Sequence, residues 1–131
     1  MIQNVIMIMH LKLFFAFFRW MYYIGHNFSS PSNIQVDHVT SHNFTVTWGE
    51  PIVRHGASIC INGYHIEVFS DQENSTIFNH TYTQEDYSHN QESLHPNYRY
   101  EIQVSAIVAE MQGPIATHSV KTNEDSKSCN D

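Results

Sequence analysis

Cysteine is scarce in this chain of 131 residues, which has only two, Cys60 and Cys129. Two cysteines cannot form the dense disulfide framework that many small secreted scaffolds use in place of a core. The fold must therefore depend on buried apolar side chains. The length is that of one domain.

Positive charge is also scarce, because six Lys and Arg face 13 Asp and Glu, for a formal net charge of −7. No acid occurs before Asp37, so the rest of the chain is more acidic than this value suggests. Such a chain has no basic stripe to replace the counterions of a phosphate backbone. We therefore expect no nucleic-acid partner.

Helical periodicity is absent from residues 31–122, which also lack internal repeats and low-complexity tracts. Instead, apolar and polar residues alternate along three short segments, Phe44–Trp48, Tyr64–Val68 and Tyr100–Ala106. Alternation with a period of two is typical of strands with one buried face. Turn-forming residues separate these segments at short intervals, which favours an antiparallel sandwich.

One stretch of the sequence has the spacing of a known family. The second predicted strand ends at Trp48, and the stretch LHPNYRYEIQVSA places Leu94, Pro96 and Tyr100 in a Leu-x-Pro-x-x-x-Tyr pattern. In this respect residues 31–122 resemble a fibronectin type III domain. The resemblance implies an all-β fold, a seven-stranded immunoglobulin-like β-sandwich.

The resemblance also implies a structural core: Trp48, Tyr64, Ile66, Leu94, Pro96, Tyr100, Ile102 and Val104. Trp48 is expected at its centre, and the Tyr100 hydroxyl is expected to bond back to the backbone in a tyrosine corner. The family pattern has an apolar residue where this chain has Gln91, so we expect a frayed or very short edge strand there. Cys60 and Cys129 are expected at opposite ends of the sandwich and therefore not bonded to each other. Cys60 is expected to be a small, largely buried filler, and Cys129 to be free or paired to another chain or a neighbouring domain.

The N-terminal segment, residues 1–28, differs from the rest, since 19 of its first 25 residues are apolar. Three interpretations stay open: a cleaved secretory signal, an uncleaved membrane anchor, or an artefact of a misplaced gene start. The charges of Lys12 and Arg19 and the poor cleavage site prevent a choice. At the other end, the polar residues 123–131 are predicted to be a disordered tail or a linker.

Asn-x-Ser/Thr sequons support passage through the secretory route, and an extracellular location, secreted or at the cell surface, is expected. The candidate glycosylation sites are Asn27, Asn43, Asn74 and Asn79.

No catalytic motif is present, and we expect neither an enzyme nor a cofactor. The chain has ten histidines, but His38 and His42, the pair with helical ligand spacing, flank a predicted turn between strands, so no metal site is expected. The sequence has no Gly-x-Ser-x-Gly elbow, and no glycine-rich loop precedes a helix.

The resemblance implies a non-catalytic extracellular or cell-surface module for protein–protein interaction, adhesion or spacing. The alternatives are an ectodomain fragment of a larger membrane receptor, such as a receptor-type tyrosine phosphatase or kinase, and an intracellular domain. The expected partner is a protein of unknown identity, and neighbouring domains outside this chain are further candidates. A membrane would be contacted only through residues 1–25, if these are not cleaved. Candidate contact surfaces are the loop Val53–Ser58, the loop Ala109–Gly113 with an exposed Met111, and the outer faces of the third and sixth strands.

Overall fold

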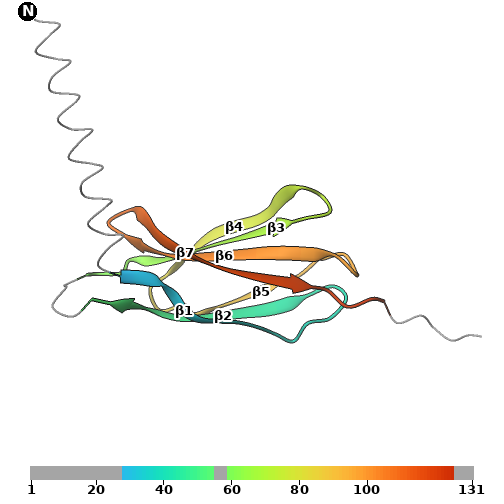
Figure 1. The fold of residues 1–131 in the computed structure, drawn as a ribbon, viewed down its shortest axis with the longest axis horizontal. Coiled ribbons are helices and arrows are strands. Elements are labelled where there is room, and N and C mark those ends of the chain that lie inside the picture. Colours follow the sequence, from blue (N-terminus) through green and yellow to red (C-terminus); the bar gives the residue numbers. More distant parts are fainter. Residues whose placement is uncertain (1–27, 55–58, 126–131) are drawn as a thin grey trace, which may run out of the picture.

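The computed structural model describes residues 28–54 and 59–125, and in these residues it contains seven strands and no helix. Two layers of strands lie face to face along the long axis of the molecule (Figure 1). The strands are β1 (Phe28–Asp37), β2 (Phe44–Val53), β3 (Gly63–Ser70), β4 (Ser75–Thr83), β5 (Ser88–Gln91), β6 (Arg99–Val108) and β7 (Met111–Lys121). The predicted all-β sandwich is confirmed.

The two sheets are both antiparallel. The three-stranded sheet has the order β1-β2-β5 and the four-stranded sheet the order β4-β3-β6-β7. Ile66 of β3 pairs with Val104 of β6, and Val46 of β2 pairs with His89 of β5. Because side chains alternate between faces, this register directs one apolar row of each central strand into the space between the sheets.

The core between the sheets contains most of the residues that the sequence predicted. Its fully buried apolar members are Phe28, Phe44, Val46, Trp48, Tyr64, Ile66, Val68, Leu94, Tyr100, Ile102, Val104 and Ala106. Pro96 was predicted to belong to this core but is only half-buried. It precedes Asn97, which has a φ of 58°, in a turn at the end of the sandwich, so its ring shapes the turn rather than filling the interior.

Trp48 and Tyr100 occupy the positions expected of them. Trp48 packs against Tyr64 and Tyr82 with ring centroids 5.9 and 6.2 Å apart. Its buried Nε1–H has no hydrogen-bond acceptor among the described residues. The Tyr100 hydroxyl accepts the backbone N–H of His95 at 3.0 Å, which closes the predicted tyrosine corner.

β1 begins before the predicted start of the domain at residue 31, and one hydrogen-bonded residue follows its predicted end at residue 122. Phe28, which the sequence placed in the signal-like segment, begins β1 and is buried. Its ring lies so close to Gly113 that a Cβ there would come within 2.5 Å of it. At the other end, Asn123 donates its backbone and side-chain N–H groups to the carbonyls of Thr40 and Val39. Asn123 is thus tied to the connection between β1 and β2. Residues 126–131 lie outside the described part, and the disordered tail or linker stays a prediction.

β5 is the short edge strand that the sequence predicted, with four residues. Gln91 takes the place of the expected apolar residue and is buried together with His89. His89 Nε2 lies 2.8 Å from Gln91 Oε1, and His89 Nδ1 lies 2.6 Å from the Tyr82 hydroxyl. A neutral imidazole that donates from Nε2 to Gln91 and accepts at Nδ1 from Tyr82 satisfies these contacts, so the polar pair is buried at little cost.

Candidate functional site

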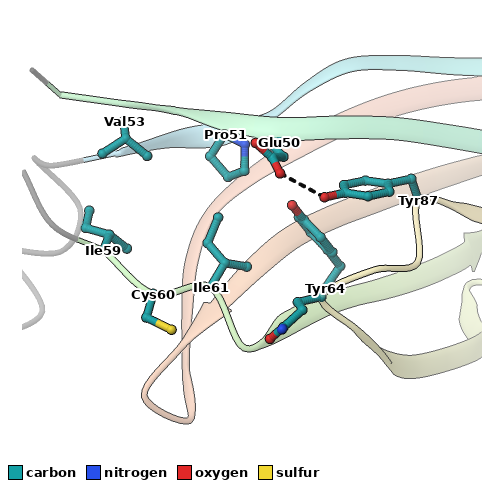
Figure 2. Close-up of a pocket in the computed structure, with 9 residues that line it drawn as sticks. Glu50, Pro51, Val53, Ile59, Cys60, Ile61, Tyr64 and Tyr87 are labelled. Atoms are coloured by element: carbon teal, nitrogen blue, oxygen red, sulfur yellow. Dashed lines mark hydrogen bonds between the residues drawn. The ribbon is translucent and has the colours of Figure 1, made fainter.

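A pocket of about 360 Å³ opens at the end of the sandwich where β2 ends and β3 begins. It is formed by the end of β2, by the connection that follows into β3, and by the β4–β5 connection, which lies farther along the chain. Figure 2 shows the side chains converging on this space. The lining residues are Glu50, Pro51, Val53, Ile59, Cys60, Ile61, Tyr64, Gln84 and Tyr87.

The floor of the pocket is a small polar group between aromatic rings. The Tyr87 hydroxyl donates to Glu50 Oε1 at 2.9 Å, and Figure 2 shows the Tyr64 hydroxyl directed toward this bond. The Tyr64 and Tyr87 ring centroids are 5.5 Å apart. Burial raises the pKa of Tyr64, and the hydrogen bond to Glu50 raises the pKa of Tyr87. Both phenols therefore stay neutral at physiological pH and act as hydrogen-bonding groups rather than as bases or nucleophiles.

The rim of the pocket is apolar. Val53 at the end of β2 is 37% exposed, and Ile59 and Ile61 are half-buried. Exposed branched side chains beside a concave aromatic surface are typical of a contact surface for a protein partner.

Cys60 lies on this rim and is exposed, so the prediction of a buried filler is wrong. It precedes the first residue of β3, outside the alternation that directs Tyr64 inward. Cys129 lies outside the described residues, and the absence of a bridge between the two cysteines stays a prediction. The expected separation of the two ends is observed, since Gly63 pairs with Ile107 at one end of β6 and Lys121 pairs with Arg99 at the other.

The two predicted contact loops differ from expectation. In the loop Val53–Ser58, Val53 and Arg54 are exposed, and residues 55–58 lie outside the described part. The loop Ala109–Gly113 is only a two-residue turn, in which Ala109 and Glu110 have φ values of 50° and 67°. Met111, predicted to be exposed, is half-buried because it already belongs to β7.

The outer faces of β3 and β6 form a second, shallower hollow of about 270 Å³, lined by Glu67, Phe69, Glu101 and Gln103. Its carboxylates already have neighbours: Thr76 Oγ1 donates to Glu67 Oε1 at 2.8 Å, and Gln103 Nε2 donates to Glu101 Oε1 at 3.0 Å. This hollow therefore offers fewer free groups than the pocket at the end of the sandwich.

The glycosylation candidates occupy different environments. Asn74, in the β3–β4 turn, and Asn79, in the middle of β4, are exposed. Asn43 is half-buried, and its side-chain oxygen accepts a hydrogen bond from Thr40 Oγ1 at 2.8 Å. Asn27 lies outside the described residues.

The histidines do not assemble a metal site within residues 28–54 and 59–125, where no group of three or more potential ligands is placed to hold an ion. His38 has a φ of 53° and follows β1, whereas His42 contacts the carbonyl of Leu94 and the carboxylate of Asp125. In the same described residues, no helix has the length and apolar character needed to cross a membrane.

The buried polar group on β5 was missed at the sequence level. His89 stacks on Phe78 with centroids 4.4 Å apart and contacts Tyr82, both from β4 in the opposite sheet. His89 and Gln91 lie two residues apart on the same face of β5. Because both are polar, the sequence gave no reason to place this face toward the core.

The strand order, the tyrosine corner and the aromatic core define an immunoglobulin-like β-sandwich module. The family model of the fibronectin type III domain matches residues 29–122, and the chain belongs to this family. Domains of this family are typically non-catalytic modules of adhesion or receptor proteins. The comparison with curated proteins gave no match.

Solved structures agree with this assignment. The FN1–FN3 domains of chicken CNTN1 are 27% identical, with a TM-score of 0.58 over 72% of this chain and 30% of that one. The FN5 domain of Drosophila Lar is 24% identical, with a TM-score of 0.57 over 74% of this chain and 97% of that one. The fn3 domain of human contactin 1 is 22% identical, with a TM-score of 0.59 over 78% of this chain and 83% of that one.

Proposed function

We propose that this chain is a non-catalytic, extracellular or cell-surface module that binds a protein partner through the pocket at the β2–β3 end. The observation that carries the proposal is the combination of the aliphatic side chains of Val53, Ile59 and Ile61 with the concave surface over Tyr64 and Tyr87. Aromatic residues in a desolvated centre, surrounded by aliphatic contacts, are the usual source of affinity in protein interfaces.

The chemistry of the pocket favours binding over catalysis. Its one carboxylate, Glu50, already accepts a hydrogen bond from Tyr87, and its phenols are held neutral. A partner could bury the aliphatic rim and compete for the Glu50–Tyr87 bond. An extracellular location is supported by the two exposed sequons, Asn74 and Asn79.

An alternative form of the proposal makes this domain one part of a larger receptor ectodomain. The similarity to CNTN1, in which the matched region is 30% of a structure of three domains, supports this arrangement. In that case the signalling part would be encoded outside this chain, and mapping both ends of the transcript would decide between the two forms.

Location is tested by expression in eukaryotic cells, with mass measurement before and after glycosidase treatment. We expect the secreted or surface-exposed chain to lose mass. An unchanged mass, with no glycan at Asn43, Asn74 or Asn79, would contradict passage through the secretory route.

Binding is tested with a fluorescent, tetramerised form of the chain applied to a panel of intact cells. Val53→Lys should abolish cell binding because it places a charge on the apolar rim. Ile115→Lys is the matched control, since Ile115 is 48% exposed and lies on β7, outside the residues that line the pocket. Equal binding by both variants would show that the pocket is not the contact surface.

A further inference from the structure

The sandwich has four exposed sheet edges, formed by β1 and β5 in one sheet and by β4 and β7 in the other. An exposed edge presents unpaired backbone N–H and C=O groups, which can pair with another chain. Proteins usually block such edges with proline, lysine, bulges, very short strands or a covering segment.

Three of the four edges carry such features. β1 contains Pro31 and three register irregularities along its pairing with β2. β5 has only four residues. β7 contains Pro114 and Lys121, and it packs against β1, whose Phe28 ring covers Gly113.

β4 lacks these features. Its nine residues, STIFNHTYT, include no proline, no glycine and no formally charged side chain, and they are rich in strand-forming residues. Its single register irregularity lies near one end, opposite Val68 and Phe69. Most of its side chains are exposed, so the edge is open to pairing.

β4 is also complementary to a second copy of itself. In an antiparallel pair with a two-fold axis at its middle residue, Asn79 faces Asn79 of the other copy, and Phe78 faces His80. No like charges meet along the strand. Aromatic pairs across strands contribute favourably to such pairing.

The strand carries one sequon at its centre, Asn79, and another begins just before it, at Asn74. Side chains directly opposite each other in an antiparallel pair have Cβ atoms about 4.5 to 5.5 Å apart. Two bulky glycans on opposed Asn79 side chains would compete for this space.

We propose that the β4 edge is a self-association surface, which forms a continuous eight-stranded sheet between two copies of the chain, and that an N-glycan on Asn79 closes it. The glycan takes the place of the features that protect the other three edges. This closing role rests on the proposed extracellular location, whereas the pairing of the bare edge does not.

Two variants of the full chain, both without the sequons at Asn74 and Asn79, separate the edge from the rest of the surface. Both carry Asn74→Gly, which removes that sequon at a position whose φ of 50° suits glycine. One adds Asn79→Gln, and the matched variant adds Asn79→Lys. In a single copy Lys at this position pairs with Glu67 of β3, so the fold is not strained, but in the dimer two lysines would oppose each other.

Sedimentation velocity measures the mass of the wild-type glycoprotein and of both variants, after circular dichroism has shown that each is folded. We expect a monomer for the wild type, twice the monomer mass for the Asn79→Gln variant, and a monomer for the Asn79→Lys variant. Two monomeric variants would overturn self-pairing and leave a strand from another protein as the occupant. Two dimeric variants would place the contact elsewhere.

The wild type tests the closing role of the glycan separately. A dimer that carries the glycan on Asn79 would overturn this role. A secreted chain with Asn79 unmodified would also overturn this role and would count against the proposed location. The comparison of the Asn79→Gln and Asn79→Lys variants would still decide whether the edge pairs.

Discussion

Replacing Tyr100 with phenylalanine removes a single hydroxyl from the tyrosine corner. Tyr100 is 1% exposed, and its hydroxyl accepts the backbone N–H of His95 at 3.0 Å. The ring itself packs near Phe44 and Tyr98, with centroids 6.3 Å away in each case. Because phenylalanine keeps these ring contacts, the substitution isolates the hydrogen bond that fastens the β5–β6 connection to β6.

The expected loss is the net free energy of one hydrogen bond, about 1 kcal/mol, plus part of the cost of leaving the His95 N–H without an acceptor. Since this N–H is only partly buried, water can replace some of the bond, and we expect a total of about 1 to 2 kcal/mol. For a domain of this size, each 1 kcal/mol lowers the Tm by roughly 4 to 8 °C.

Urea denaturation of Tyr100→Phe, compared with Tyr98→Phe, measures this loss. Tyr98 is half-buried and its hydroxyl has no hydrogen bond to the described residues, so Tyr98→Phe should change the free energy of unfolding by no more than about 0.5 kcal/mol. The reasoning is refuted if the two variants lose equal stability. A loss well above about 3 kcal/mol would also refute it, because one hydroxyl cannot account for that amount.

Three further predictions follow from buried and exposed groups elsewhere. Burial lowers the pKa of His89 from its usual value of 6.5, so the unfolded chain binds a proton more readily than the folded protein does. The free energy of unfolding should therefore decrease as the pH is lowered below about 6.5. Urea titrations should show a smaller decrease for His89→Phe. Phe28→Ala should cost about 3 to 5 kcal/mol in the same assay, whereas a loss under 1 kcal/mol would show that the sandwich does not need the residue. Cys60 should react with a thiol reagent in the native protein without denaturant, and a peptide map that joins it to Cys129 would contradict the predicted free thiol.

The sequence alone predicted the sandwich because its evidence is local. Alternation along Phe44–Trp48 and Tyr100–Ala106 indicates strands with one buried face, whatever they pack against. The spacing of Leu94 to Tyr100 predicts the corner because the turn and the hydroxyl that closes it lie within a few residues of each other. The short β5 strand was predictable for the same reason, from the polar residue at position 91.

Contacts between distant segments could not be predicted in this way. The ring of Phe28 lies over Gly113, and His89 is buried because Phe78 and Tyr82 of the other sheet cover it. The candidate pocket likewise needs the β4–β5 connection brought beside the β2–β3 connection at one end of the sandwich, and this depends on sheet order and register. Alternation assigns a residue to one of two faces of a strand, but only the packing of the two sheets decides which polar residues that face can bury and which apolar residues it leaves exposed.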